Sequence, residues 1–280
     1  MSFYLEKTGN NIWQGRFSLF PSDVAVHGIS TRLGGQSAAP YASLDLALHV
    51  GDAPEAVWQN RQRFCAALGL DARRICTPEQ VHGNRVLRVG RKDAGRGSRV
   101  YSDSIAATDA LITDEPGLPL LLCFADCTPI LLLDPVHRAV GIAHGGWKGT
   151  VQKIAAGTVQ AMQAAFGTRP AEVLVGIGPA IGPCCYEVGD EVAAQFAAAF
   201  PGATELLPVV EGHTHLDLWQ ANQYQLEQVG VKPEHIDRAD TCTACNSELF
   251  FSYRADGGRT GRIGAVIALK EDGFPQGFHR

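Results

Sequence analysis

The sequence lacks any long hydrophobic run, and no stretch of it is dominated by basic residues. No apolar segment reaches the roughly 20 residues that a membrane-spanning helix needs. The opening segment MSFYLEKTGNNIW lacks the basic and apolar regions of a secretory signal. The formal net charge is -5, with both signs mixed along the chain, so no patch indicates binding to a phosphate backbone. We therefore expect a cytoplasmic protein with neither a membrane nor a nucleic acid as its partner.

Cysteine is also scarce, because 8 residues in 280 are too few for a disulfide scaffold. In a reducing compartment, free thiols or metal ligands are the better expectation. Cys242 and Cys245 form a CxxC pair. Together with the adjacent Cys184 and Cys185, this pair has three interpretations: a structural zinc site, a redox pair or ordinary free thiols. Adjacent cysteines do not easily bind one tetrahedral ion, so the sequence favours free thiols.

Linkers and internal repeats are absent as well. No segment rich in Pro, Gly or Ser divides the chain, and no period of roughly 20 to 50 residues indicates a solenoid or a propeller. Hydrophobic residues make up 45% of the sequence and are spread along it, which is enough for a large core. Residues 1–280 are therefore expected to form one domain, present as a monomer or a homodimer.

Short apolar runs bounded by Asp, Pro or Gly dominate the middle of the chain and indicate strands buried on both faces. A strand over residues 24–31 leads into a turn-rich loop that carries Arg32. Asp52 is expected to cap a helix that has Pro54 in its first turn. The class is mixed α and β. Further helices are expected over 149–167, 189–200 and 217–230, and further strands near 172–177 and 263–269.

Polar residues interrupt the buried strands in the segment FADCTPILLLD. An isolated buried cysteine such as Cys127 is usually a small hydrophobic core residue. Asp126 beside it weakens that interpretation, because a carboxylate has no place in an apolar core without a function. Cys127 is therefore a candidate functional thiol.

Two histidines also lie at the boundaries of predicted elements. His144 ends the apolar run AVGIAH, and His82 lies in PEQVHGNRV just before a short strand. A structural histidine bonded to a backbone carbonyl is an alternative for either. One thiolate and two imidazoles suit Zn²⁺, and three protein ligands leave the fourth position open, as in catalytic sites. No local motif such as HExxH links the three residues, so spacing alone gives only a weak indication.

Six segments together resemble the YfiH family, also called the peptidoglycan editing factor or polyphenol oxidase (laccase-domain) family, to which the immune-metabolic protein FAMIN is also similar. They cover nearly the whole chain in the family's order: ISTRLGGQSAAPYASLDLALHVGD, QVHGNRV, DALITDEPGLPLLLCFADCTPILLLDP, AVGIAHGGWKGT, GIGPAIGPCCYEVG and DTCTACNSELFFSYRADGGRTGR.

The resemblance implies an α+β fold of the αββα type, in which mixed β-sheets pack together and are flanked by helices. It implies a zinc site formed by the QVHG histidine, the ADCTP cysteine and the AHGGWKG histidine, which are His82, Cys127 and His144 here. It also implies phosphorolysis of purine nucleosides, namely adenosine, inosine and S-methyl-5'-thioadenosine, together with deamination of adenosine. The expected partners are therefore a small nucleoside and phosphate.

On this basis we expect the three candidate ligands and Asp126 to be catalytic. A zinc ion would supply an activated water, and Asp126 is the expected proton carrier, as carboxylates are in zinc deaminases. Arg32 and Lys148 are expected to hold phosphate. Lys148 follows the glycine-rich turn after His144, where a helix start can itself bind an anion.

The chain departs from the family at two places. Asp45 stands in SLDL where the family commonly has Asn, so this expected substrate contact carries an added charge. The family commonly reads SYRRDG where this chain reads SYRADG, with Ala255 in place of the second Arg, and an extra Gly follows the segment. Arg254, which remains, is expected to reach the pocket, and a surface salt bridge is its alternative.

Two other functions compete with the zinc enzyme. Copper-dependent phenol oxidation by a type-one centre and a trinuclear cluster needs more paired histidines than the nine scattered ones present, although a His and Cys site also binds Cu²⁺. His213 and His215, the only close pair, are expected to be exposed on one face of a strand. A cysteine hydrolase or amidase acting on peptidoglycan precursors would use Cys127 as nucleophile, His144 as base and Asp126 as the orienting group.

Overall fold

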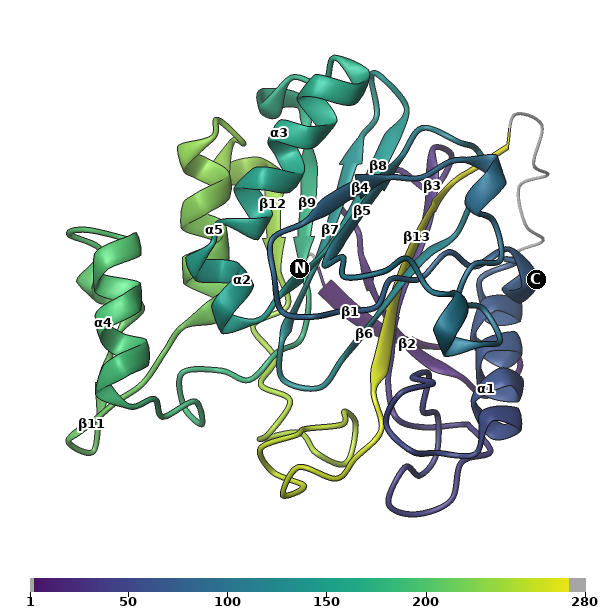
Figure 1. Cartoon of the computed structure of the whole chain (residues 1–280), viewed down its shortest axis with the longest axis horizontal. Coiled ribbons are helices and arrows are strands. Elements are labelled where there is room, and N and C mark those ends of the chain that lie inside the picture. Colours follow the sequence, from purple (N-terminus) through teal and green to yellow (C-terminus); the bar gives the residue numbers. More distant parts are fainter. Residues whose placement is uncertain (1–2, 272–280) are drawn as a thin grey trace.

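Two β-sheets lie face to face in the computed structural model, which describes residues 3–271 (Figure 1). The first sheet has five strands, and each strand runs antiparallel to its neighbours. Its spatial order is β1 (Phe3–Lys7), β2 (Trp13–Phe17), β3 (Ala25–Ser30), β13 (Ile263–Leu269) and β6 (Leu120–Phe124).

The second sheet has six strands of mixed direction, because its two edge pairs are parallel and its central pairs antiparallel. Its order is β12 (Ile236–Arg238), β9 (Leu174–Ile177), β7 (Thr128–Asp134), β8 (Ala139–Gly145), β5 (Ala110–Thr113) and β4 (Val86–Arg88). A short separate hairpin pairs β10 (Val209–Val210) with β11 (His213–Thr214). The expected mixture of strand directions is thus confined to the six-stranded sheet.

Helices cover the outer face of each sheet. Figure 1 shows α1 toward one end of the molecule and α3, α4 and α5 toward the other. The described part of the chain contains α1 (Pro54–Ala67), α2 (Trp147–Val151), α3 (Ile154–Phe166), α4 (Asp190–Ala199) and α5 (Leu218–Gln228). The α+β class and the αββα layering expected from the sequence are confirmed.

The central strands explain this layering, because their residues are buried on both sides. Leu122 of β6 points into the core between the sheets, whereas its neighbour Leu121 packs in the core beneath α1. In the six-stranded sheet, Leu131 of β7 faces the other sheet and Leu132 faces the helices. Burying each such side chain contributes about 1.5–3 kcal/mol. Successive side chains of a strand point to opposite faces of its sheet. Runs that look uniformly hydrophobic therefore produce three apolar layers, one between the two sheets and one on the outer face of each sheet.

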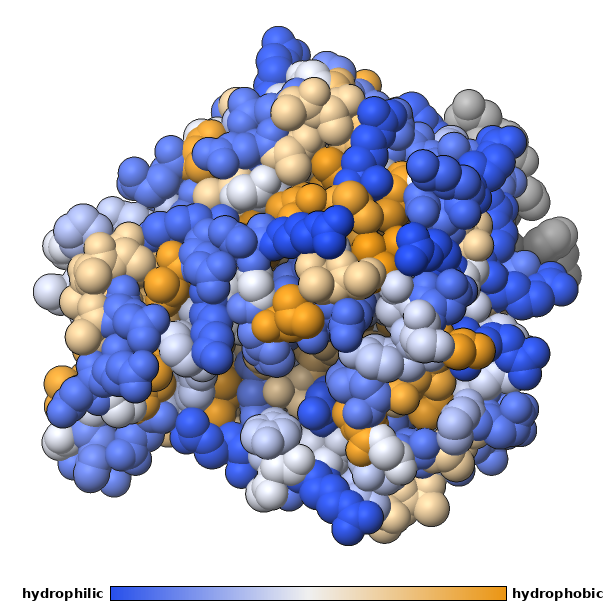
Figure 2. All heavy atoms as spheres, in the orientation of Figure 1, coloured by the Kyte–Doolittle hydropathy of each residue, from blue (hydrophilic) through white to orange (hydrophobic). Residues whose placement is uncertain are grey.

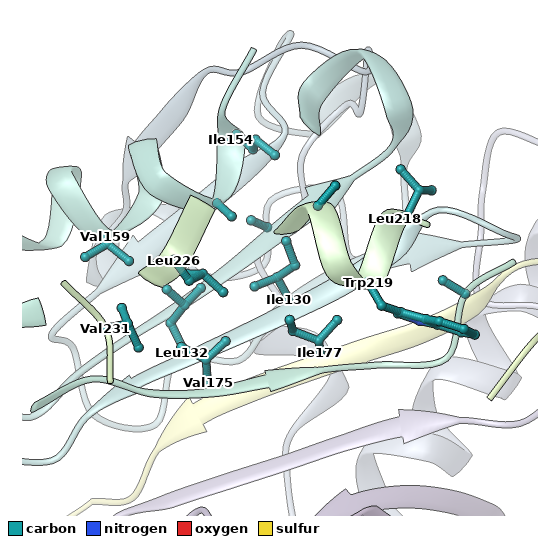
Figure 3. Packing of buried hydrophobic residues seen from close by; sticks show 14 of the residues in the cluster. Ile130, Leu132, Ile154, Val159, Val175, Ile177, Leu218, Trp219, Leu226 and Val231 are labelled. Carbon is teal, nitrogen blue, oxygen red and sulfur yellow. The ribbon is translucent and has the colours of Figure 1, made fainter. Parts of the chain in front are cut away.

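The core under α3 and α5 is drawn in Figure 3. Ile130 and Leu132 of β7 and Ile177 of β9 face the side chains of the two helices. Gly141 of β8 lets α3 approach, because a Cβ there would lie 3.2 Å from the Met162 sulfur. This packing of α3 against β8 holds the end of β8, where His144 lies, in place.

Two predictions about the helices are wrong. The helix expected over 149–167 is two helices, because Lys153 has a left-handed backbone (φ 64) that separates α2 from α3. Asp52 is not the capping residue of α1: Ala53 occupies that position without a side-chain cap, and Asp52 accepts a hydrogen bond from the Ala53 N–H. The predicted strand at 263–269 coincides with β13.

Hydrophilic side chains cover most of the face seen in Figure 2, with smaller hydrophobic areas between them. Within residues 3–271, none of the helices is both long enough and apolar enough to cross a bilayer.

Candidate active site

Three side chains from separate segments converge where the two sheets meet. Cys127 lies in the connection that leads from β6 of one sheet to β7 of the other, His144 lies at the end of β8, and His82 lies in the loop before β4. One ligand atom of each lies within 4.8 Å of the others, and the two imidazole ring centres are 4.7 Å apart. His144 is buried and His82 is exposed. The cluster is therefore closed on one side and open on the other.

The carboxylate of Asp109, just before β5, holds two of these three residues. Its Oδ1 lies 2.9 Å from His144 Nδ1 and accepts a hydrogen bond from the His82 backbone N–H at 2.9 Å. Its Oδ2 accepts from the N–H groups of Gly83 and Val81. With Nδ1 turned toward the carboxylate, His144 presents its other nitrogen to the cluster, which is the usual arrangement behind a metal-binding histidine.

The electrostatics of the cluster favour a thiolate. Burial alone would raise the pKa of Cys127, but the nearby His144 and His82 outweigh it and lower that pKa from 9.0 to about 6. Burial likewise lowers the pKa of His144, but the Cys127 thiolate and Asp109 outweigh it and raise that pKa to about 9. Since the thiolate is both the nucleophilic and the metal-binding form of cysteine, the lowered pKa suits Cys127 to either role.

The donor set fits a zinc ion. A thiolate and two imidazoles are borderline-soft ligands, and three of them leave a position for water or substrate. The backbone of Gly146 lines the cluster: a Cβ there would lie 3.0 Å from Cys127 Sγ and 3.1 Å from His82 Cδ2. Any larger residue at 146 would intrude on the space between the donors. Glycine in the GGWKG turn therefore keeps this space clear.

A cavity of about 510 Å³ opens beside the cluster, a size typical of small-molecule sites. Its walls combine the three candidate ligands with aromatic, apolar and cationic groups. The other lining residues are His49, Gln80, Cys123, Ala125, Asp126, Trp147, Ile181, Tyr186, Leu218, Tyr253, Arg254 and Arg262.

Two guanidinium groups belong to the cavity wall. Arg254, expected from the sequence, lies over the Tyr186 ring at 5.3 Å, and its Nη1 donates to the carbonyl of Cys185 at 3.4 Å. Arg262, which the sequence analysis did not single out, lies over the Tyr253 ring at 5.6 Å. Together they make this part of the cavity suitable for an anion.

Asp126 lines the same cavity, but it does not contact His144 in the structure. Its Oδ1 accepts from the Thr243 hydroxyl at 2.7 Å, and its Oδ2 accepts from the Arg254 backbone N–H at 2.7 Å. The expectation that Asp126 orients His144 in a cysteine-hydrolase triad is wrong, because Asp109 occupies that place. Asp126 instead ties the candidate ligand next to it to the loop that carries Arg254.

Arg32 and Lys148 are not among the residues that line the cavity. The Arg32 guanidinium donates to the carbonyls of Ala42 and Ser247, and it stacks at 4.6 Å over Phe251. Lys148 is exposed on α2, with its amine 5.5 Å from the ring centre of Trp147. Of the three basic residues expected from the sequence, only Arg254 lines the cavity, and Arg262 lines it as well.

Asp45 is fully buried behind the cavity wall and does not line it. Its Oδ1 accepts from the backbone N–H groups of Ala47 and Arg262, while its Oδ2 has no hydrogen-bond partner. Burial outweighs the two backbone donors and raises the pKa of this carboxyl from 3.8 to about 7. Asp45 therefore supports the backbone of a cavity residue and is not itself part of the cavity wall.

We expect the variant Asp45→Asn to gain stability over the wild type as the pH rises. Because the folded-state pKa is raised, the neutral carboxyl stabilises the wild type at low pH, and this contribution is lost between about pH 4 and about pH 7. The full loss amounts to about 4 kcal/mol, of which about 3 kcal/mol falls between pH 5 and pH 8, and the amide of Asn does not titrate. Urea unfolding at pH 5 and pH 8 measures the difference. The exposed Asp103→Asn serves as control, and an Asp45→Asn effect equal at both pH values would contradict the assignment.

The two close histidines differ from expectation. His213 is exposed and pairs with Glu187 at 3.1 Å, but His215 is buried and lies 2.6 Å from the Pro183 carbonyl. They are therefore not a same-face exposed pair, and neither lines the cavity.

The chain is similar to several known proteins. It is 42% identical over 250 residues to a protein named purine nucleoside phosphorylase YlmD from Geobacillus stearothermophilus, covering 89% of this chain and 91% of that protein. It is also 42% identical over 250 residues to a purine nucleoside phosphorylase from Deinococcus radiodurans, with the same coverage. The crystal structure of YlmD from Geobacillus stearothermophilus superposes with a TM-score of 0.90 at 39% identity, covering 95% of this chain and 99% of that one.

Residues 26–270 match the family model described as multi-copper polyphenol oxidoreductase laccase. This range contains the three candidate ligands, Asp109 and every residue of the cavity wall. The chain therefore belongs to this laccase-like family, the YfiH family that its motifs indicate.

Proposed function

We propose that this protein is a zinc-dependent purine nucleoside phosphorylase that acts on adenosine, inosine and S-methyl-5'-thioadenosine, and that it also deaminates adenosine. The observation that carries the proposal is the His82, Cys127 and His144 cluster in the wall of a cavity that also contains two guanidinium groups. The names of the similar proteins support the phosphorylase class.

A zinc ion would be held by one nitrogen of His82, the Cys127 thiolate and the free nitrogen of His144. Bound there, it would supply a Lewis acid that polarises an oxygen or a water at the fourth position. Asp109 keeps the His144 ring oriented and fixes the backbone of His82. Asp109 therefore orients both histidines for metal binding through contacts within the chain itself.

Phosphorolysis forms a bond between a phosphate oxygen and ribose C1′ while the bond from C1′ to the purine nitrogen breaks, and the departing purine takes up a proton. Arg254 and Arg262, which line the cavity, would bind the phosphate and offset its charge. Holding phosphate and nucleoside side by side supplies much of the rate acceleration.

The purine would stack on the aromatic part of the wall, formed by Trp147, Tyr186 and Tyr253. Asp126 is the carboxylate of the lining and carries the proton in our proposal. In deamination, water adds to the purine carbon that bears the amine, ammonia leaves, and Asp126 again moves the proton. Burial, followed by the nearby Arg262, lowers the pKa of His49 to about 4, so this ring is neutral at pH 7 and offers a hydrogen bond without charge.

The test is to incubate the purified protein with adenosine in the presence and absence of phosphate and to resolve adenine, inosine and hypoxanthine. We expect adenine and ribose 1-phosphate to appear only with phosphate, and inosine to appear in both samples. An Arg254→Ala variant should raise the KM for phosphate by about tenfold or more, equivalent to about 1.4 kcal/mol of lost binding. Absence of product from every nucleoside would refute the proposal.

A cysteine hydrolase is the second candidate, and the lowered pKa of Cys127 is the observation that favours it. In such an enzyme Cys127 is the nucleophile, His144 the base and Asp109 the orienting group. Copper oxidation is the older meaning of the family name, and the same donors would bind Cu²⁺ more tightly than Zn²⁺. Metal analysis of protein purified without added metal separates the three: stoichiometric zinc that is lost in a Cys127 variant supports the zinc enzyme.

A further inference from the structure

Four cysteines from two loops gather in one cluster outside the cavity lining. Cys184 and Cys185 lie in the first loop (residues 178–189), which follows β9, and Cys242 and Cys245 lie in the second loop (residues 239–262), which follows β12. Because β9 and β12 are parallel neighbours, both loops begin at the same end of the strands, their carboxyl end. A further parallel bridge between Ala180 and Cys242 keeps the loops together beyond the strands.

The four sulfur atoms all lie within 4.8 Å of one another. Cys245 Sγ is 3.5 Å from Cys184 Sγ and 3.3 Å from Cys185 Sγ. Four thiolates bound to zinc at about 2.3 Å stand roughly 3.8 Å apart at the corners of a tetrahedron. The sulfurs therefore need to move by only a fraction of an ångström to surround one ion.

The backbone of the first loop allows two adjacent cysteines to contribute. The N–H groups of Cys185 and Tyr186 both donate to the Gly182 carbonyl at 3.0 Å, which forms a tight turn. Within this turn both Cys184 and Cys185 contact Cys245. The objection from the sequence, that neighbouring cysteines do not easily bind one ion, is thus met by the shape of the turn.

A backbone donor and a cation also lie beside the cluster. The Gly182 N–H lies 3.2 Å from Cys242 Sγ, the kind of outer hydrogen bond that orients a metal-bound thiolate. The Arg254 guanidinium donates to the Cys185 carbonyl and brings a positive charge near the thiols. Cys184 and Cys245 are exposed, so an ion can enter from solvent.

From this geometry we infer that Cys184, Cys185, Cys242 and Cys245 bind a second zinc ion, distinct from the cavity cluster. Four protein sulfurs leave no open position, so the ion is structural. It ties the first loop, which carries Tyr186 of the cavity, to the second loop, which carries Arg254. Thr243, between the two CxxC cysteines, donates to Asp126 next to Cys127, so the ion also stabilises the wall behind the candidate active site.

The test is zinc analysis of the full chain purified under reducing conditions without added metal. We expect about two zinc ions per chain in the wild type and about one in Cys245→Ser. The matched variant Cys127→Ser should lose the ion of the cavity cluster and keep the other, so failure of the proposed active site does not affect the result. Cys76→Ala, which changes a buried cysteine outside both clusters, should retain both ions.

A second measurement does not depend on the folding of Cys245→Ser. Cys127→Ser loaded with Co²⁺ should show the intense visible bands of a tetrahedral thiolate site and a sulfur-to-cobalt charge-transfer band in the near ultraviolet. A Cys127→Ser protein that binds neither zinc nor cobalt would overturn the inference. A disulfide joining any two of the four cysteines in the freshly purified wild type, detected by mass after alkylation, would overturn it as well.

Discussion

Cys127→Ala is expected to abolish phosphorolysis and to remove the ion of the cavity cluster. The change deletes the thiolate, the one charged donor among the three candidate ligands, and leaves two imidazoles that bind zinc more weakly. We expect kcat/KM for adenosine to fall by about 10³-fold or more, equivalent to about 4 kcal/mol of transition-state stabilisation. Product formation and zinc content measured on the same preparation check both parts.

The cysteine-hydrolase alternative also predicts that Cys127→Ala is inactive. Treatment of the wild type with a metal chelator distinguishes that mechanism from the zinc mechanism. Removing the ion from the wild type with a strong chelator should abolish activity, and adding Zn²⁺ should restore it. An enzyme that uses Cys127 as its nucleophile would keep its activity after chelation, but it would lose that activity when the thiolate is alkylated. Cys76→Ala is the control for both treatments, because this cysteine lies outside the two clusters. Activity that persists in metal-free wild type would contradict the zinc mechanism.

Strands buried on both faces were predictable because short, strongly apolar runs encode them, whereas the αββα layering was implied only by the family resemblance. The runs that became β6, β7 and β8 are all buried along their whole length, and such runs need cover on both faces. The boundary between α2 and α3 was not predictable, because Lys153 at a positive φ gives no compositional signal of a break. Local pattern therefore identified which elements exist better than it identified where they end.

The candidate ligands were predictable only through the resemblance, since each taken alone had an ordinary structural explanation. Asp109 was missed because an aspartate before a strand looks like a boundary residue. Its function depends on contacts with residues 81–83 and with His144, which are distant in sequence. A buried carboxylate whose two oxygens collect four donors is recognisable only in three dimensions.

The cationic residues show the same limit. Arg32 follows a predicted strand and belongs to a family motif, yet its guanidinium is used within the fold by the carbonyls of Ala42 and Ser247. Arg262 ends another family segment just before β13, and its guanidinium also donates to the carbonyls of Thr260 and Gly261, yet its side chain lines the cavity. A basic residue in a sequence is equally suited to either use, so only the position of its neighbours decides which one applies.

Asp109→Ala is expected to weaken zinc binding at the cavity cluster and to destabilise the fold. The change leaves His144 Nδ1 and three backbone N–H groups without their acceptor. A buried donor left unpaired costs about 1–3 kcal/mol. Of the four donors, only His144 Nδ1 is buried, while the three backbone N–H groups are partly buried. We therefore expect the free energy of unfolding to fall by about 1–3 kcal/mol or more. Loss of the orienting carboxylate should also lower zinc affinity by about 10- to 100-fold.

Asp109→Asn separates the two effects. The amide keeps one acceptor oxygen and the size of the side chain, but its NH₂ group must face at least one donor, because both carboxylate oxygens accept hydrogen bonds now. We expect a smaller loss of stability than in Asp109→Ala, with zinc affinity still reduced, as measured by chelator competition. The control is Asp126→Asn, which alters a cavity carboxylate that, like Asp109, accepts a hydrogen bond at each oxygen but does not contact His144. If Asp109→Asn bound zinc as tightly as Asp126→Asn, Asp109 would be a structural residue of the 81–83 loop and not the group that positions the ligand.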